Sequence, residues 1–445
     1  MTSEKRELRT RARLSQVHPS GVKHCPSEAV RRRLAYELRL VVDPQREIQA
    51  LVDFDGRWPG TDAERRAAGH LVARLRSLGR EAELEPTRVR PGYPLTHIVH
   101  ALLGIAGSVL SVNKPLIGAL LVLLAAVSTF GDLTGSFLLV RRLMPVRASQ
   151  NVVSRSYGGK PGLLVLTAHY DSARTGAVFG RRVLERTATL SKLVRRPLGL
   201  FGAFFWSLVV ILVCCILRII GIDLLPVTVI QFIATVVLIV AVPLLADIAL
   251  SGVVPGANDN ASGVATVMRL ADRFDDGLEH FDTLVLFPGA AEGFSLGMRA
   301  WLRRHRKELD RASTVFLNVD MAGHGTVRWH QKSGFVIPLA FHPALLRLCE
   351  ELAEEHNARG IVRRTVSDAY SARSSGFPAV SVGCLNAMDY VPTYHQHTDL
   401  PSAIDDDALD RAYHFCSDLI TLIDERIGPD LARDTPETVL SEEDS

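Results

Sequence analysis

Four long apolar segments constrain the fold of this chain more than any other feature. Most of them reach the roughly 20 residues that a helix needs to cross a hydrocarbon layer about 30 Å thick. Charged side chains are almost absent from them, whereas the rest of the chain is ordinarily polar. We therefore predict four transmembrane helices, at residues 95–112, 116 to about 140, 198–220 and 227 to about 250.

The apolar segments form two closely spaced pairs. Residues 113–115 connect the first pair and residues 221–226 connect the second. Connections this short suit helical hairpins that cross a membrane and return, so the polar parts of the chain share one side of it. The first segment contains His97 and His100, and taken alone it could be a buried helix of a soluble domain. The pairing favours the membrane.

Lysine and arginine near the segment ends predict the orientation, because these residues are enriched in cytoplasmic loops. The short connections offer little beyond Lys114 and Arg218, whereas arginines are frequent at the other ends. We therefore expect a multi-pass protein of the cell membrane, embedded in the lipid bilayer, with its polar part in the cytoplasm. The arginines are Arg88, Arg90, Arg141, Arg142, Arg147, Arg195 and Arg196.

Two acidic residues inside the apolar segments do not indicate a transport pathway. Asp132 and Asp247 lie near segment ends rather than at the membrane centre, where an ionisable side chain would suggest a path for ions or substrates. We expect both to be caps at the membrane surface, which disfavours a transporter or a channel.

The charge balance and the cysteines exclude other classes of protein. The 51 basic and 48 acidic residues nearly cancel, so nothing indicates a nucleic-acid partner. Six cysteines, Cys25 among them, show no metal or disulfide spacing, and we expect a reducing compartment. The polar N-terminus lacks the apolar stretch of a secretory signal, so residues 1 to about 92 should stay on the side where they are made.

The polar part alternates between strand-like and helix-like segments. Residues 61–78 have helical spacing, with Thr61 or Asp62 as the N-cap and Gly79 as the stop. Short apolar or β-branched runs, typical of buried strands, lie between such helices, and the alternation predicts an α/β layered fold. The strand candidates are residues 162–168, 283–287 and 314–319.

Five short motifs carry metal-type ligands at the ends of the predicted strands or in the loops after them, where α/β sheets gather their ligands. Each motif alone could be an ordinary polar loop or a helix cap. Together they offer histidines and carboxylates without cysteine, which suits zinc, with manganese or cobalt as alternatives. The candidates are His169 and Asp171 (168–172), Asp259 (256–263), Glu292 (289–292), Asp320 (318–323), and His395 with His397 (394–399).

The order of these motifs resembles the M28 family of di-zinc aminopeptidases. The chain reads HYD, GANDNASG, AAE, NVDMAG and YHQHTD where the family has HxD, GxNDNxSG, a glutamate pair, NxDMxG and a YH motif followed by aspartate. Residues 367–379 also resemble the SD…GIPA stretch of the family, and the match covers most polar residues from about 57 to 425. The resemblance implies a mixed-sheet, three-layer α/β domain of the zinc-aminopeptidase, phosphorylase/hydrolase-like kind, with four inserted transmembrane helices.

This resemblance divides the chain into seven parts. The polar domain would be interrupted twice by membrane hairpins and flanked by two tails. The parts are a polar tail (1–45), N-terminal helices of the domain (46–92), the first transmembrane hairpin (93–142), the part with the HxD motif (143–196), the second hairpin (197–251), the part with the remaining motifs (252–426) and an acidic disordered tail (427–445).

The resemblance also implies a role for each matching residue. Two Zn²⁺ ions would be the cofactors, and the partner would be a peptide. Asp171 would act as a carboxylate behind the ligands, and Tyr394 would face the oxyanion of a tetrahedral intermediate. The implied metal ligands are His169 and Asp320 for one ion, Glu292 and His395 for the other, and Asp259 as the bridge between them.

The family pattern selects between the two neighbouring histidines. In that pattern the ligand histidine is followed by an aspartate four positions on, and by Ile-Asp about nine and ten positions on. Asp399, Ile404 and Asp405 fit this register from His395 only. We therefore expect His395 to be the ligand and His397 to be a polar neighbour.

One position departs from the family pattern. The family has Ala-Glu-Glu, with the first glutamate as the general base, whereas this chain has Ala290, Ala291 and Glu292. The family also has a glycine five residues after the ligand glutamate, and Gly297 fits only if Glu292 is that ligand. Alanine cannot accept a proton, and a positioned base typically contributes about 10²–10⁴ in rate.

The sequence therefore predicts a membrane-anchored M28-like zinc metallohydrolase that removes N-terminal residues from peptides. The alternative is a pseudopeptidase that retains metal for structure or to bind a peptide or an amine. A glutaminyl-cyclase-like activity on the same fold remains open, although nothing in the sequence selects it. His397 or Glu279 could replace the missing base.

Overall fold

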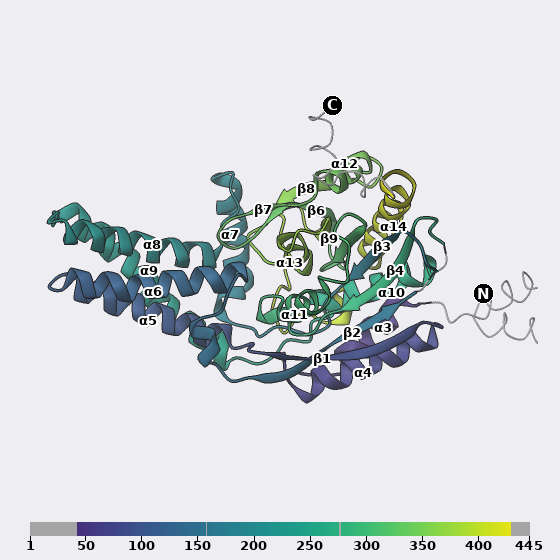
Figure 1. Ribbon diagram of the computed structural model, residues 1–445, viewed down its shortest axis with the longest axis horizontal. Coiled ribbons are helices and arrows are strands. Elements are labelled where there is room, and N and C mark those ends of the chain that lie inside the picture. The colour runs from purple at the N-terminus through teal and green to yellow at the C-terminus, as the bar shows by residue number, and fades with distance from the viewer. Residues whose placement is uncertain (1–41, 157, 276, 429–445) are drawn as a thin grey trace, which may run out of the picture. The chain divides into compact units, whose positions relative to one another are not determined.

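The computed structural model describes residues 42–156, 158–275 and 277–428. Most of the two expected tails, 1–45 and 427–445, and Cys25 lie outside the described residues. The remaining five cysteines are free and buried. The described polar part is built around a sheet, and the four apolar helices lie together at one side of it (Figure 1).

A mixed sheet of nine strands forms the centre of the polar part. Its strand order is β1-β2-β4-β3-β5-β9-β6-β7, and β8 pairs with β6. The central strands β4, β3, β5 and β9 run parallel, and antiparallel pairs flank them. The strands are β1 (Glu81–Val89), β2 (Arg147–Arg155), β3 (Gly162–Thr167), β4 (Phe281–Phe287), β5 (Thr314–Val319), β6 (Thr326–Ser333), β7 (Leu339–Ala340), β8 (Arg359–Val362) and β9 (Ala379–Leu385).

The three predicted strands are confirmed as β3, β4 and β5. Strand β1 was not predicted, because its many charged residues obscure the alternation of a strand. Among the described strands, β1 pairs with β2 alone and lies at the edge of the sheet, where charged side chains remain in solvent and discourage pairing with another chain.

Helices cover both faces of the sheet. Side chains alternate along each strand, so Leu164 and Leu166 of β3 enter one core whereas Val165 enters the other. The first core contains residues of α3 (Pro44–Val52), α4 (Asp62–Ser77), α10 (Ser262–Arg273), α12 (Pro343–Glu351) and α14 (Asp406–Leu422), and the second contains residues of α11 (Leu296–His305) and α13 (Asp368–Ser374). The expected mixed-sheet, three-layer α/β arrangement is therefore confirmed.

The expected N-terminal helix is α4, and its cap is as predicted. Thr61 Oγ1 accepts a hydrogen bond from Glu64 N at 3.2 Å, which satisfies one of the free N–H groups of the first turn. The helix ends before Gly79, whose φ of 88° lies in the left-handed region that glycine adopts without steric cost.

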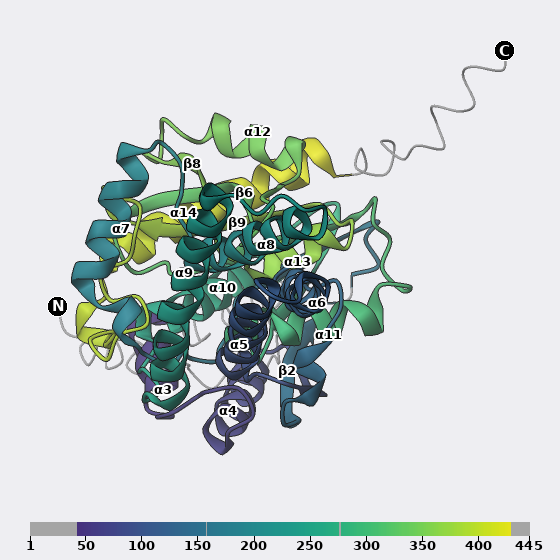
Figure 2. The ribbon, with the colours of Figure 1, turned by 90° about the vertical axis from the view of Figure 1, so that its left-hand side faces the viewer.

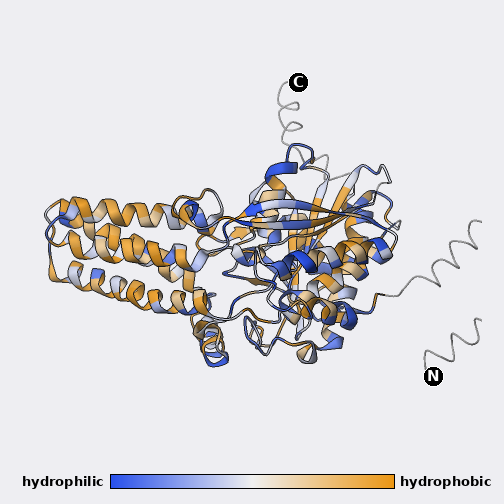
Figure 3. Ribbon diagram, turned by 90° about the horizontal axis from the view of Figure 1, so that it is seen from below, coloured by the Kyte–Doolittle hydropathy of each residue, from blue (hydrophilic) through white to orange (hydrophobic). Residues whose placement is uncertain are grey.

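The four predicted apolar helices are present and are long and apolar enough to cross a membrane. They pack as a ring in which α5 contacts α6 and α9, and α8 contacts α6 and α9. Figure 2 looks along these helices, and the ribbon in Figure 3 is coloured as hydrophobic over most of their length. Large apolar side chains on the outside, such as Leu116 and Phe232, are 62% and 66% exposed, as suits contact with lipid. The helices are α5 (Tyr93–Ser111), α6 (Pro115–Thr134), α8 (Leu200–Ile219) and α9 (Leu225–Leu250).

Two details of the bundle differ from expectation. Helix α6 ends at Thr134 rather than near residue 140, because Gly135 adopts a left-handed conformation with a φ of 75°. Asp132 was expected to be a surface cap, but it is 1% exposed and pairs with Arg141 Nε at 2.9 Å. Asp247 does lie near a helix end, where it accepts a hydrogen bond from Ala177 N at 2.6 Å.

Candidate metal centre

Neighbouring parallel strands bring the candidate ligands together. His169 follows β3, Asp320 follows β5, and Glu292 lies in the short helix η4 (Ala291–Gly293) after β4. The carboxyl ends of β4, β3 and β5 open at the same edge of the sheet, so residues far apart in the sequence become neighbours.

The loop that carries Asp259 also fixes the loop after β5. Asn260 Oδ1 accepts a hydrogen bond from Met321 N at 2.9 Å, and Asn258 Oδ1 accepts one from Gly323 N at 2.8 Å. The amide side chains of the GANDNASG motif thus fix the backbone of the NVDMAG motif through hydrogen bonds. This explains why two motifs separated by more than fifty positions place their carboxylates side by side.

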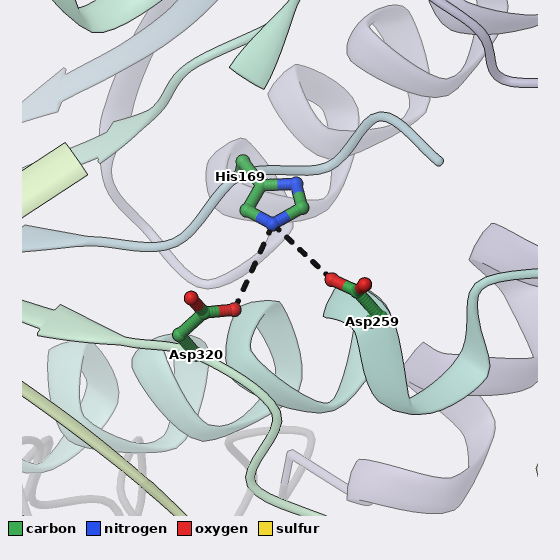
Figure 4. A group of neighbouring side chains, drawn as sticks. All are labelled: His169, Asp259 and Asp320. Carbon is green, nitrogen blue, oxygen red and sulfur yellow. Dashed lines mark ion pairs between the residues drawn. The ribbon is translucent and has the colours of Figure 1, made fainter. Parts of the chain in front are cut away.

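Asp259 lies between two groups of candidate ligands. In the first group, His169 Nε2 is 3.5 Å from Asp259 Oδ1 and 3.7 Å from Asp320 Oδ1 (Figure 4). In the second group, His395 Nε2 is 3.2 Å from Asp259 Oδ2 and 3.5 Å from Glu292 Oε2. The five residues that the sequence predicts as ligands therefore converge, and each carboxylate oxygen of Asp259 belongs to a different group.

The spacing of these atoms fits metal ions. Two ligand atoms held tetrahedrally about 2.0–2.2 Å from one zinc ion lie about 3.4 Å apart, close to the separations observed here. Asp320 Oδ1 is buried and has no hydrogen-bond donor within the described part of the chain. Burial, followed by repulsion from Asp259, raises the pKa of Glu292 well above its ordinary value. Three crowded carboxylates without enough donors need cations, so the residues fit a site for two metal ions.

Asp171 holds one ligand and the loop of another. It is completely buried, and its Oδ1 lies 3.4 Å from His169 Nδ1. The same carboxylate accepts hydrogen bonds from Ala291 N at 3.0 Å and Glu292 N at 2.9 Å. A carboxylate behind a histidine ligand orients the ring and fixes its tautomer, which is the role expected for Asp171.

The loop around Glu292 is strained and is held from several sides. Glu64 Oε1 accepts a hydrogen bond from the backbone N of residue 290 at 3.0 Å, and Arg141 donates one to the carbonyl of Gly293 at 2.7 Å. Residues other than glycine rarely adopt the left-handed backbone conformation, which costs about 1–3 kcal/mol for each of them, so surrounding contacts must fix the loop. The left-handed residues are Ala290, Phe294 and Ser295, with φ of 54°, 75° and 58°.

The two neighbouring histidines have different environments. His395 is buried and belongs to the second ligand group, whereas His397 is exposed and belongs to neither group. Asp399 accepts hydrogen bonds from Asn258 N at 2.9 Å and Asp259 N at 3.0 Å. The aspartate four positions after His395 therefore holds the backbone of Asp259 and belongs to neither ligand group.

Tyr394 closes one side of the centre. Its ring stacks on His395 with the ring centroids 3.9 Å apart, and Phe179 packs edge-on against His395. Burial, followed by the negative charges of Asp259 and Glu292, raises the pKa of Tyr394 well above its ordinary value. The phenol therefore stays protonated and is able to donate a hydrogen bond.

The candidate ligands line a pocket of about 60 Å³ that also contains Ala291 and Asp368. Asp368 is 2% exposed, and its Oδ1 accepts a hydrogen bond from Ser295 Oγ. Its Oδ2 is buried without a donor among the residues that the structure describes, and burial raises the pKa of Asp368 to about 6. From the sequence, Asp368 was placed in the SD stretch but was not predicted to be a functional residue. The signal that could have identified it is an aspartate at the start of a helix within a stretch that resembles the family.

Neither residue suggested as a replacement base lines this pocket. Glu279 precedes β4, whereas the Glu292 loop follows it, so the two lie at opposite ends of the strand. His397 lies beside Gly252 at the surface. Asp368 is thus the carboxylate outside the ligand groups that lies in the pocket beside Ala291.

Comparisons with known proteins agree with the resemblance in part. The model of a family described as Peptidase family M28 matches residues 244–420, a range that includes Asp259, Glu292, Asp320 and His395 but not His169. No curated protein matches the sequence.

Solved structures extend the comparison to the fold. The chain is similar to glutaminyl cyclase from Porphyromonas gingivalis, with 14% sequence identity, a TM-score of 0.50, and 86% of this chain and 98% of that chain covered. It is also similar to the aminopeptidase LapA of Legionella pneumophila (12% identity, TM-score 0.48, 95% and 84% covered) and to the zinc aminopeptidase BSAP of Bacillus subtilis (12%, 0.49, 85% and 93%). At this identity the first similarity shows the fold, and the M28 family match supports a metallopeptidase-like function.

Proposed function

We propose that this protein is a membrane-anchored metallohydrolase of the M28 type that removes N-terminal residues from peptides. The observation that carries the proposal is the convergence of two ligand groups on Asp259. Two imidazoles and three carboxylates suit a pair of zinc ions. The four apolar helices would anchor the protein in the membrane, and the arginines at their ends favour a cytoplasmic polar domain.

The residues around the ligands suit hydrolysis. Two bound ions would polarise a peptide carbonyl and lower the pKa of a water molecule. Asp171 and Asp399 hold His169 and Asp259 in place, so the ligands do not need to rearrange as charge develops. Tyr394 lies in the pocket as a protonated donor for the oxyanion.

The attacking water needs a proton acceptor, which Ala291 does not provide. We assign this role to Asp368, because it lines the same pocket and its buried Oδ2 has no hydrogen-bond donor among the described residues. As the water oxygen bonds to the carbonyl carbon, Asp368 Oδ2 takes a proton from the water. When the C–N bond breaks, the same carboxyl gives that proton to the leaving amine.

Ala291 itself favours a second function, in which the metal centre is retained for structure or for binding a peptide or an amine. This pseudopeptidase would hold about two metal ions per chain but would not turn over peptides. The two functions differ in whether Asp368 has a role, because a centre that only binds metal needs no proton acceptor.

The test uses the full chain purified in detergent and loaded with zinc. We would measure metal content and the release of the first residue from a free and from an N-acetylated peptide, with an N-terminal glutamine peptide to detect cyclisation. Asp259→Ala should remove the activity, and Asp368→Asn should lower kcat about 10²–10⁴-fold. Asp410→Asn, which changes an exposed carboxylate paired with Arg269, is the matched control and should leave kcat unchanged.

Three results would contradict all or part of this proposal. If the parent chain holds metal but is inactive, and Ala291→Glu creates activity, the pseudopeptidase is correct. If the parent is active and Asp368→Asn matches it, hydrolysis stands but Asp368 is not the proton acceptor. Cyclisation of the glutamine peptide without hydrolysis would replace the peptidase reaction.

A further inference from the structure

A second and larger pocket, of about 500 Å³, adjoins the metal centre. It shares Thr365 and Tyr394 with the smaller pocket that contains the candidate ligands. Its volume lies within the range of about 300–1,000 Å³ that is usual for ligand pockets. Its lining residues come from α7 (Arg181–Leu193) and the segment that leads to α8, and from β8 and the loop before Tyr394.

The walls of this pocket carry a large excess of positive charge. The carboxylate in its lining, Asp389, already pairs with Arg359 at 2.6 Å and with Arg328 at 3.2 Å. The other cations of the lining are therefore not neutralised by it. The cations that line the pocket are Lys192, Arg195, Arg196, Arg359, Arg363 and Arg364.

Several of these cations have free donors. Arg195 and Arg196 are exposed, and no carboxylate in the described ranges 42–156, 158–275 and 277–428 pairs with either of them. Arg363 donates to the carbonyl of Asp389 at 3.1 Å, but its Nε is buried and has no acceptor among those residues. A buried donor without an acceptor is destabilising, and an anionic ligand that accepts its hydrogen bond would remove that cost.

We propose that this pocket binds acidic side chains of the peptide substrate, on the side of the cleaved bond away from the N-terminus. The proposal rests on the proposed function, because it takes the first residue of the peptide to lie at the metal centre. A chain leaving the metal centre past Tyr394 enters the larger pocket, where aspartate or glutamate can form charge-assisted hydrogen bonds with guanidinium groups.

Two alternative roles for these cations have less support. Arg195 and Arg196 also serve as orientation signals beside α8, but that role requires only charge near a helix end and not a pocket that continues into the metal centre. An anionic lipid headgroup would also pair with guanidinium groups, and α7 directly precedes an apolar helix. The residues shared between the two pockets favour a ligand that reaches the metal centre, as a peptide does.

The test measures binding rather than turnover. The zinc-loaded full chain in phosphatidylcholine nanodiscs would be titrated with Ala-Glu-Glu-Gly and Ala-Gln-Gln-Gly peptides that carry a neutral fluorophore and a first peptide bond reduced to a methyleneamine. The acidic peptide should bind about tenfold more tightly at low salt, with the preference falling as salt rises. Arg195→Ala/Arg196→Ala should reduce the preference to about twofold or less, because each exposed ion pair contributes only modestly and the variant loses two of them. Arg182→Ala, which changes an exposed arginine of α7 outside the pocket, should keep it.

The outcomes distinguish a peptide site from a lipid site. Equal affinity for both peptides, or an equal loss in the Arg182→Ala control, would overturn the proposal. If the peptide affinities are equal and the Arg195→Ala/Arg196→Ala variant also binds phosphatidylserine vesicles more weakly than the parent, the ligand is a lipid headgroup and the proposal is wrong. A preference for the acidic peptide without hydrolysis would refute the proposed function but retain the pocket, whereas hydrolysis without that preference would refute the pocket alone.

Discussion

Arg141 connects the apolar bundle to the loop that carries Glu292, and its removal gives the sharpest test of the structure. The residue is 1% exposed, pairs with Asp132 at 2.9 Å, donates to the carbonyl of Gly293 at 2.7 Å and lies over the ring of Phe294 at 4.9 Å. Arg141→Ala would leave Asp132 buried without its guanidinium partner and with the imidazole of His97 3.3 Å away, and breaking a buried ion pair in this way costs about 3–5 kcal/mol.

The expected loss should be visible as a lower melting temperature. A change of 1 kcal/mol shifts Tm by about 2–4 °C in a domain of 150–250 residues, and by less in longer chains, so we expect a decrease of about 5–10 °C. The assay is thermal unfolding in detergent, followed by tryptophan fluorescence. Arg142→Ala is the matched control, because this neighbouring arginine is exposed and should change Tm by less than about 1 °C.

A double variant separates stability from the connection to the metal loop. Asp132→Leu/Arg141→Met leaves no unpaired charge, so it should regain most of the lost Tm. It still lacks the donor to Gly293, however, and should bind zinc about 10–100-fold more weakly, as when a group that supports a ligand is removed. Equal melting of Arg141→Ala and Arg142→Ala would refute the buried-pair argument. A double variant with the zinc affinity of the parent would refute the connection.

Three further predictions concern the metal centre and the fold. Asp399→Ala should weaken zinc binding about 10–100-fold in a competition titration, whereas His397→Ala should leave it unchanged. Gly297→Ala should lower Tm, because its methyl group would collide with a backbone carbonyl, whereas Gly69→Ala in the open side of α4 should raise stability by up to about 1 kcal/mol. Activity should fall as pH falls through the pKa of Asp368, because only the ionised carboxylate accepts a proton. Bound cations would place this decrease in activity at or below about pH 6, and Asp368→Asn should remove the pH dependence.

The parts of the fold that were predicted from the sequence depend on local patterns. Strands β3, β4 and β5 are largely apolar or β-branched runs, and α4 has a cap, a helical period and a glycine stop within one short stretch. Most candidate ligands were predicted because their motifs follow a strand or open a helix, whereas His395 was predicted from the register of the family pattern. Parallel strands then bring those ends together without further information from the sequence.

The parts that were missed depend on contacts between distant residues. Arg141 is an orientation signal by sequence position, yet its side chain is buried between Asp132 and a loop more than 150 positions later. The role of Asp368 likewise requires that the start of α13 pack against Ser295. Neither contact has a local period or motif, so burial and pairing of these charges could not be deduced from the chain itself.

The contacts around Ala291 bear on whether the centre is catalytic. The backbone N of this residue binds Asp171, and its side chain has no part in holding Glu292, so alanine at this position is compatible with an intact metal site. Asp368 is different, because a buried carboxylate oxygen without a donor costs about 1–3 kcal/mol. A centre that served only to hold metal would gain stability by losing that carboxylate. Its presence in the pocket beside Ala291 is therefore better explained by a proton that it must accept.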